Sequence, residues 1–422
     1  MSMKFLSFEI KNFKGVKDLK LDLGSAPSLS IFSLVGLNES GKTTVLEAID
    51  MFQTDIPQEI RHNLIPRNLS SNFTGDVTVK AVLELSPEDK VKLKKYAQDE
   101  LKIELEHIGD RFTVTHGYKY DGSEYKEKID VWSIDLTGKA GKSVKVKKLY
   151  DMDTDHARWQ KLLTHIADTL MPRVIYYPNF LFNFPERIYL NGDDSEIQLI
   201  YRKMLQDILD SLNEGLDLEK HVLERMKGVN TDPAKRKALE SVILKMSTKI
   251  TETVITPWDS IFSSKKKGAS DNKEVKVEYG IEETESSVTP APVTDPLTEP
   301  APEGTKKHYL AISIRQGSEI YQIEERSLGF KWFFAFLMFT QFRKNRSTDE
   351  GETLFLVDEP ASNLHSSMQK RLANEVKSIV DKSKLIFTTH SQHLINPDWL
   401  EATYVVQNKA LDYSKELDYT TT

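Results

Sequence analysis

The chain has 422 residues, too many for one compact core and enough for two or three. It is 39% hydrophobic and 29% charged, and no run approaches the roughly 18 to 20 apolar residues that cross a bilayer, which excludes a membrane-embedded protein. Cysteine is absent, which excludes disulfides, thiolate metal sites and cysteine nucleophiles. The net charge of −7 argues against a uniformly basic nucleic-acid binder but leaves room for a local basic patch. With no secretory signal pattern at the start, these features predict a cytoplasmic protein.

Up to about residue 177, the sequence predicts mainly strands, with two helices between them. Periodicity predicts strands at 5–10, 19–23, 29–35, 76–85 and 174–177, helices at 42–52 and 87–101, and a meander of short strands between 111 and 150. From 193 to 262 the apolar spacing is helical. It predicts two long helices joined through 228–232, with Pro233 at the first position of the second helix. The pair could be a core element or a projecting stalk.

Residues 282–307 are rich in proline and predict a surface loop. Strand-like residues flank it, so the loop is expected to join two neighbouring strands. Beyond it, the pattern predicts a hairpin at 310–323, helices at 331–343 and 366–380, and strands at 354–357 and 385–389. Strands that alternate with helices indicate a mostly parallel sheet.

A phosphate-binding loop is predicted between the third strand and the first helix. Residues 36–43 read Gly-Leu-Asn-Glu-Ser-Gly-Lys-Thr and fit G-x-x-x-x-G-K-[ST] at every fixed position. Its backbone N–H groups and the helix N-terminus would bind phosphate oxygens. Lys42 would reach the β and γ phosphates of ATP, and the Thr43 hydroxyl would ligate Mg²⁺. The alternative is a purely structural glycine turn that binds no ligand.

An apolar strand that ends in two acids supplies the second half of the predicted site. Asp358 and Glu359 follow Leu354-Phe355-Leu356-Val357. A buried strand would deliver both carboxylates beside the phosphate loop. Asp358 would then hold Mg²⁺, and Glu359 would orient and deprotonate the attacking water. An apolar strand that ends in Asp-Glu is by itself weak evidence for a nucleotide site. Together with the phosphate-binding loop it becomes strong evidence.

The two halves are too far apart in sequence for one compact P-loop domain of about 100 to 150 residues. Ser327-Leu328-Gly329 precedes the acidic strand, and His390 follows the next strand. In this order of motifs the chain resembles ABC-type ATPases, especially the branch that includes RecF, the structural-maintenance-of-chromosomes proteins and the OLD nucleases. Residues 10–15 and 36–44 are similar to the opening strand and phosphate loop of that branch. The resemblance covers roughly 1–60 and 308–395.

The resemblance implies a homodimer in which each active site needs two chains. Ser327 and the N–H of Gly329 would bind the γ-phosphate held by the other subunit, Asn363 and Leu364 would form a loop at the dimer interface, and His390 would contact the γ-phosphate. The nucleotide-binding residues would be Gly36, Asn38, Glu39, Ser40, Gly41, Lys42, Thr43, Thr44, Ser327 and Gly329. Two departures from the family are visible: Ser-Leu-Gly replaces Ser-Gly-Gly, and the expected lobe-linking glutamine is replaced by candidates Asn179 and Asn183.

For several other side chains, an ordinary structural role is at least as well supported by the sequence as a functional one. Lysines in the meander could bind a nucleic-acid backbone or could equally protect a hairpin edge. They are Lys139, Lys142, Lys145, Lys147 and Lys148. Aromatic residues after the signature are expected to pack in the core rather than stack on bases. They are Trp332, Phe333, Phe334, Phe336 and Phe339. Arg326 is expected to pair with Glu324 or Glu325, and His365 and His393 lack the spacing of a zinc site.

The predicted fold class is α/β: a P-loop NTPase of ABC type, with a mixed β lobe, a parallel-sheet lobe and an inserted helical hairpin. Residues 1–190 would form the N-terminal part of the ATPase head, 191–262 the hairpin, 263–307 a strand and the proline-rich loop, and 308–422 the C-terminal part of the head. The catalytic residues would be Lys42, Glu359 and His390, and the metal ligands Thr43 and Asp358.

The resemblance implies an ATPase that couples ATP–Mg hydrolysis to the control of a separate effector or nuclease subunit. This arrangement looks like the ATPase subunits of phage-defence systems such as PARIS or Septu, with dimers that could assemble further. The alternative is an ATPase of DNA repair, similar to RecF, that clamps DNA. A cytosolic transporter subunit and a scaffold that binds ATP without hydrolysing it are less consistent with the large insertion and with the intact Glu359.

Overall fold

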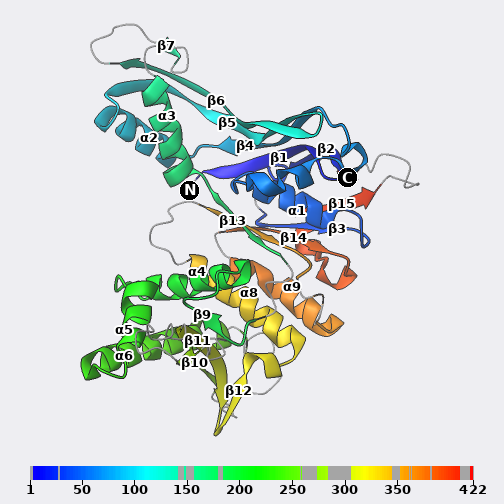
Figure 1. The fold of residues 1–422 in the computed structure, drawn as a ribbon. Helices are drawn as coiled ribbons and strands as arrows, with labels where there is room; N and C mark the ends of the chain where they lie inside the picture. Colours follow the sequence, from blue (N-terminus) through cyan, green and yellow to red (C-terminus); the bar gives the residue numbers. More distant parts are fainter. Residues whose placement is uncertain are drawn as a thin grey trace, which may run out of the picture. The chain divides into compact units, whose positions relative to one another are not determined.

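The computed structural model describes most of the chain, apart from several segments. The described residues are 3–26, 29–140, 147–148, 156–178, 184–256, 258, 273–283, 306–344, 352–360, 362, 364–380, 383–408 and 419–421. They form two compact units (Figure 1). The first comprises Met1–Asn179, Thr348–Ser362 and Leu372–Thr422, and the second comprises Phe180–Ser347 and Asn363–Arg371. Among the described helices, none is both long enough and apolar enough to cross a membrane.

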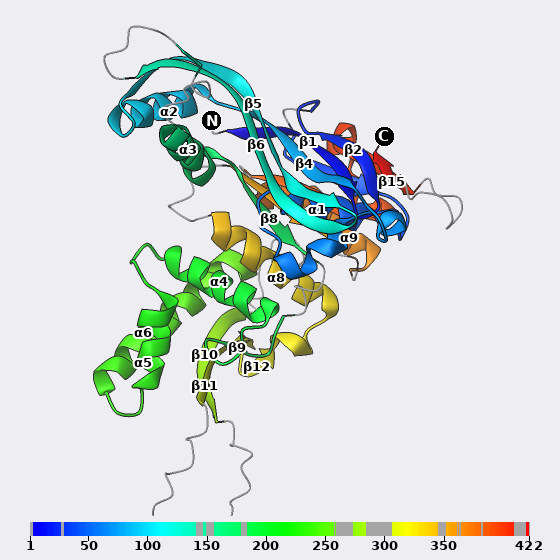
Figure 2. The ribbon, with the colours of Figure 1, turned by 45° about the horizontal axis from the view of Figure 1, so that its top comes forward.

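An antiparallel sheet forms one layer of the first unit, in the order β2-β1-β4-β5-β6-β7. Its strands are β1 (Lys4–Phe13), β2 (Val16–Asp22), β4 (Gly75–Glu84), β5 (Ile103–Asp121), β6 (Glu124–Ala140) and β7 (Lys147–Lys148). Alternating residues of β4, from Val77 to Leu83, are fully buried, as the period-2 pattern predicts. The prediction of several short strands after residue 110 was wrong, because β5 and β6 form one long hairpin that turns at Gly122 and Ser123 (Figure 2).

Two helices of this unit come after strands of the antiparallel sheet in the sequence, one after β4 and one after β7. They are α2 (Pro87–Asp99) and α3 (His156–His165). The start of α2 is fixed by a capping box, in which Ser86 accepts from the Asp89 N–H and the Asp89 carboxylate accepts from the Ser86 N–H. Pro87 stands at the first helical position, where its missing N–H is not needed.

A second, mostly parallel sheet carries the candidate site, in the order β16-β15-β3-β14-β13-β8. Its strands are β3 (Ile31–Val35), β8 (Arg173–Tyr177), β13 (Thr353–Val357), β14 (Lys384–Thr389), β15 (Thr403–Asn408) and the antiparallel β16 (Tyr419–Thr421). Helix α1 (Lys42–Met51) contacts strands of both sheets, including β1 and β8. Helix α9 (Ser366–Val380) contributes its residues from Leu372 onward to this unit. The α/β P-loop NTPase fold, with an antiparallel and a parallel sheet, is thereby confirmed.

The second unit combines helices with a small antiparallel sheet. The helices are α4 (Glu196–Asp210), α5 (Glu224–Lys227), α6 (Pro233–Ile250) and α8 (Leu328–Lys344), and the strands are β9 (Ile188–Tyr189), β10 (Lys273–Glu283), β11 (Lys306–Gln316) and β12 (Glu319–Gln322). Strands β10 and β11 pair from Lys273 with Gln316 to Glu283 with Lys306. The strands that flank the proline-rich segment are therefore neighbours, as predicted, while residues 284–305 lie outside the described residues.

The prediction of two long helices over residues 193–262 was wrong. The chain leaves the helix after α4, and Asn213 and Gly215 take left-handed backbone conformations with φ of 55° and 64°. A π turn and α5 follow before α6. The predicted turn at 228–232 is present, and Asp232 caps α6 with Pro233 at its first position. Because α6 buries Leu239 and Met246 and contacts β10, α4 and α5, the helices form a core rather than a stalk.

The aromatic residues of α8 pack inside the second unit. Trp332, Phe333, Phe334, Phe336 and Phe339 are all at most 5% exposed. The ring of Trp332 stacks on that of Phe336 at 5.1 Å, and Phe184 meets Phe334 edge-on at 5.5 Å. The prediction of core packing is confirmed, and these rings are not available to stack on nucleic-acid bases.

Candidate nucleotide site

The predicted phosphate loop has the expected strand–loop–helix context. Strand β3 ends at Val35 and α1 begins at Lys42, with Glu39 and Gly41 in left-handed conformations at φ of 64° and 97°. A Cβ on Gly36 would lie 2.4 Å from the carbonyl oxygen of Val406 and 2.6 Å from Ser40 Oγ. Glycine is therefore required at the point where the loop passes β15.

The side chain of Lys42 is buried at the centre of the site and is only 5% exposed. Its ammonium donates to the carbonyl oxygens of Gly36 and Leu37, at 3.0 and 2.9 Å. The same Nζ lies 3.2 Å from Glu359 Oε1. The loop lysine and the predicted general base, which stand at opposite ends of the sequence, thus meet at one point.

Thr43 and Asp358 also meet, at the first turn of α1. The Thr43 hydroxyl lies 3.0 Å from both carboxylate oxygens of Asp358, and Thr388 Oγ1 donates to Asp358 Oδ1 at 2.7 Å. Burial raises the pKa of Asp358 above its ordinary value. A hydroxyl beside a buried carboxylate is a donor set that suits Mg²⁺, and a bound divalent cation would favour the ionised acid.

Glu359 is held from several sides. Its Oε2 lies 2.8 Å from His390 Nδ1, while its backbone N–H donates to the Thr388 hydroxyl at 2.7 Å. Its backbone adopts φ of 47°, a conformation that a non-glycine residue seldom takes and that recurs at functional sites. The carboxylate of Glu359 is therefore oriented by Lys42 on one oxygen and by His390 on the other.

The loop residues fit a bound phosphate chain. Ser40 Oγ is buried and has no hydrogen-bond partner among the described residues, although it lies within the loop. Helix α1 points its N-terminus, with Thr43 and Thr44 in the first turn, at the same place. Asn38 and Glu39 are exposed on the outer part of the loop. An orphaned hydroxyl, a glycine-dependent curve and a helix N-terminus together form a cradle for an anion.

The predicted signature residues belong to the second unit. Ser327 precedes α8, and its hydroxyl accepts from the Phe330 N–H at 3.3 Å, so it caps the helix. A Cβ on Gly329 would lie 2.1 Å from Leu364 Cδ2, which places the predicted interface residue Leu364 directly against the signature. Leu328, which lies between Ser327 and Gly329 in the sequence, is 54% exposed.

Other candidate residues have local partners or lie outside the described part. Arg326 lies over the rings of Tyr321 and Phe330 at 4.9 and 5.3 Å, instead of pairing with a neighbouring glutamate as predicted. Lys139 pairs with Glu106, and His365 Nδ1 lies 3.0 Å from Ser367 Oγ. Side chains that the structure does not describe are those of Lys142, Lys145, Lys147, Lys148, Asn179, Asn183 and Asn363.

Thr388 is a site residue that the sequence analysis missed. It is fully buried on β14, donates to Asp358 and accepts from Glu359. The available signal was a threonine pair at the end of an apolar strand, immediately before His390. Only the parallel register of β13 and β14 shows which of the two threonines faces the acids.

A protein-family model described as AAA ATPase domain matches residues 3–395. The chain belongs to this ATPase family. Solved structures similar to it include an SMC head bound to the C-winged helix domain of ScpA, with 13% identity, a TM-score of 0.49 and coverage of 99% of this chain and 96% of that one. The SMC head domain from Thermotoga maritima has 12% identity, a TM-score of 0.42 and coverage of 100% and 98%.

A curated relative of this ATPase-family chain is the uncharacterized protein MJECL43 of Methanocaldococcus jannaschii. The two are 29% identical over 84 residues. The match spans 20% of this chain and about a fifth, 22%, of the relative.

Proposed function

We propose that this chain binds ATP with Mg²⁺ and hydrolyses the γ-phosphate by in-line attack of water. The observation that carries the proposal is the Glu359 carboxylate, which contacts both Lys42 and His390 beside the Thr43–Asp358 pair. Membership of an ATPase family supports the same conclusion. A cation, a metal-binding pair and a general base with its orienting partner are the groups that phosphoryl transfer to water requires.

Each residue of the site has a role that follows from its position. The loop N–H groups and Lys42 would bind the β and γ phosphates, and Thr43 and Asp358 would hold Mg²⁺. The bound metal would neutralise charge on the phosphate oxygens. Glu359 would orient the attacking water and accept its proton, while His390 keeps the carboxylate aimed at that water.

The proposal extends to an ATP-dependent homodimer that controls a separate effector or nuclease subunit in phage defence, because the order of the motifs resembles that of the ATPase subunits of such systems. Ser327 stands at the N-terminus of the 17-residue helix α8, where the helix dipole favours an anion. It would bind the γ-phosphate of the partner chain, together with the N–H of Gly329. The exposed side chain of Leu328 next to it is consistent with a surface that meets another chain.

The Glu359→Gln variant tests the base. Losing a general base is expected to lower kcat by roughly 10²- to 10⁴-fold. Because the amide still fills the site, ATP should stay bound, and the variant should accumulate as a dimer in light scattering with ATP and Mg²⁺. Glu240→Gln, an exposed residue of α6 that pairs with Arg236, is the matched control and should hydrolyse ATP normally.

Two results would contradict different parts of the proposal. Hydrolysis by Glu359→Gln at the wild-type rate would show that the base is misassigned. If Glu359→Gln lost hydrolysis but formed no ATP-dependent dimers, the assignment of the base would stand and the site shared between two chains would be refuted. Adding duplex DNA to the wild-type assay separates the alternative, since a DNA clamp predicts stimulated hydrolysis and salt-dependent DNA binding.

A further inference from the structure

The segment that follows the phosphate-loop helix is fixed by one face of a single strand. His116, Tyr118 and Tyr120 alternate along β5, so their side chains leave the same face of the strand. Each of them bonds to residues 52–61. The contacts are the His116 ring with the Phe52 carbonyl, the Tyr118 hydroxyl with the Ile56 N–H and Asp55 Oδ1 (both 2.9 Å), and the Tyr120 hydroxyl with the Arg61 carbonyl (2.8 Å).

Gln53 ties the same segment to the strand that supports the metal-binding acid. Its side-chain amide donates to the Pro172 carbonyl at 2.7 Å and accepts from the Val174 N–H at 2.8 Å, so it pairs with β8 as a neighbouring strand would. At the other end of β8, the Tyr177 carbonyl accepts the Asp358 N–H at 3.1 Å. Gln53 therefore connects the end of α1 to the strand against which Asp358 is held.

These contacts join α1, which carries the proposed ligand Thr43, to β8, the strand that neighbours β13 and its proposed ligand Asp358. Helix α1 presents Thr43 at its first turn, and β8 supports Asp358. We propose that Gln53 and His116 are positioning residues that set the Thr43–Asp358 geometry, and hence the Mg²⁺ affinity, from the far end of α1. The inference rests on the proposed ATPase function and adds a link from the antiparallel sheet to the metal site.

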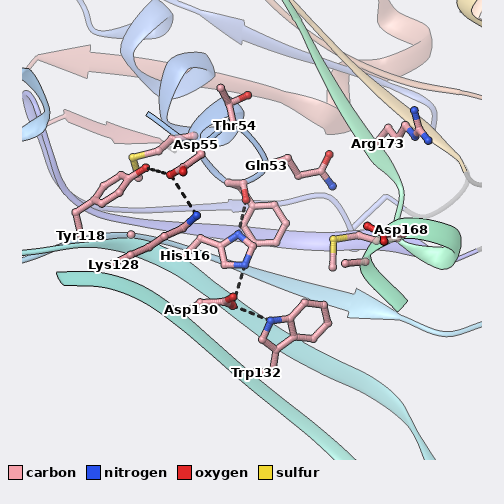
Figure 3. A pocket seen from close by; sticks show the side chains of 15 residues that line it. Gln53, Thr54, Asp55, His116, Tyr118, Lys128, Asp130, Trp132, Asp168 and Arg173 are labelled. Atoms are coloured by element: carbon pink, nitrogen blue, oxygen red, sulfur yellow. Dashed lines mark hydrogen bonds and ion pairs between the residues drawn. The ribbon is translucent and has the colours of Figure 1, made fainter. Parts of the chain in front are cut away.

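We call residues 52–55, with their contacts to β5 and β8, the joint. A cavity of about 520 Å³ lies against it (Figure 3). The ring of His116 stacks on that of Phe52 at 4.8 Å, and its Nε2 lies 3.2 Å from Asp130 Oδ1, which also accepts from Trp132 Nε1 at 2.7 Å. Gln53 lines the cavity with these residues. One face of α1 is buried, including Val45, Leu46 and Ile49, whereas the joint borders a cavity, so the joint is the place where a lost hydrogen bond can become a displacement.

The decisive variant is Gln53→Glu, which keeps the size of the side chain and its acceptor for Val174 but presents an oxygen to the Pro172 carbonyl. Affinity for a fluorescent ATP analogue is measured in EDTA and across a Mg²⁺ titration. We expect less than a twofold change in EDTA and a roughly 10-fold rise in the Mg²⁺ concentration needed for half-maximal enhancement. That is the lower end of the effect of losing a group bonded directly to a metal ligand, and Gln53 acts through β8 rather than on a ligand. Gln407→Glu, exposed on β15, is the matched control and should behave as wild type.

Variants of His116 separate its hydrogen bond from its stacking. His116→Phe keeps a ring against Phe52 without a donor and should reproduce the Mg²⁺ defect, while His116→Gln supplies an amide donor and should restore part of the affinity. Equal losses with and without Mg²⁺, or an unchanged Mg²⁺ dependence in Gln53→Glu, would overturn the positioning role. Wild-type protein that binds no nucleotide would instead refute the proposed function itself.

Discussion

Replacing Gly36 by alanine adds one methyl group at the tightest point of the phosphate loop. The new Cβ would lie 2.4 Å from the Val406 carbonyl oxygen, about 1 Å inside an ordinary carbon–oxygen contact of roughly 3.3 Å. Ser40 Oγ, at 2.6 Å, can rotate away. Val406 cannot yield as readily, because β15 is paired with β3 on one side and with β16 on the other.

The loop must therefore move by about 1 Å relative to β15. Overpacking of this kind costs about 1–3 kcal/mol of folding free energy. A displacement of about 1 Å at a reacting group can lower the rate by roughly 10²-fold. We expect Gly36→Ala to remain folded and to lose about two orders of magnitude in kcat/KM for ATP, measured by phosphate release alongside thermal unfolding.

Gly24→Ala provides the comparison for this prediction. A Cβ at Gly24 would meet its nearest neighbour, Asp22 Oδ1, at 3.4 Å, an ordinary contact. That variant should retain wild-type hydrolysis and stability. If Gly36→Ala hydrolysed ATP as well as Gly24→Ala, the loop would not depend on its approach to Val406, and the geometric argument would fail.

Two further changes test other parts of the structure. Thr388→Val removes the donor to Asp358 and leaves the Glu359 N–H without its acceptor, so we expect a loss of about 1–3 kcal/mol in chemical denaturation and a weaker response of nucleotide binding to Mg²⁺. Burial lowers the pKa of His308 below its ordinary value of 6.5, so the unfolded chain binds the proton more readily. The unfolding free energy should therefore fall as the pH drops below about 6.5, and His308→Gln should flatten that fall between pH 7.5 and 5.5. An unchanged slope in the variant would show that another group is responsible.

The parts of the site that the sequence could predict depend on local chain geometry. Residues 36–43 combine a strand, a glycine-dependent turn and a helix start, and each step is specified by neighbouring residues. The acids Asp358 and Glu359 follow an apolar strand for the same reason. The meeting of Lys42 with Glu359 could be expected once the phosphate loop and the two acids were both placed after the carboxyl ends of parallel strands.

Residues that act through long-range register were not predictable in this way. Thr388 contacts both acids only because β14 pairs with β13 in one particular alignment. Gln53 follows α1 as an ordinary polar residue, and its partners, Pro172 just before β8 and Val174 on β8, are more than 100 positions away. The local pattern around Gln53 does not separate it from a surface residue, and the threonine pair before His390 does not show by itself which threonine faces the acids.

The missed break after α4 is different, because its signal was present in the sequence. Asn213 and Gly215 are the residue types that most readily take left-handed conformations at the ends of helices. Apolar spacing continued across them, and the prediction gave that spacing more weight than the end signal. The turn before Pro233 was predicted correctly because Asp232 and Pro233 reinforce each other.

The position of β3 in its sheet has a consequence for biosynthesis. In Figure 1 this early, blue strand is flanked by β14 and β15, which come from the orange-to-red end of the chain. About 350 residues separate β3 from β14. At roughly 5 to 20 residues per second, the ribosome would need about 20 to 70 seconds to supply the neighbours of β3. During that interval an apolar strand has no native partner, so nascent chains should engage chaperones until translation reaches β14.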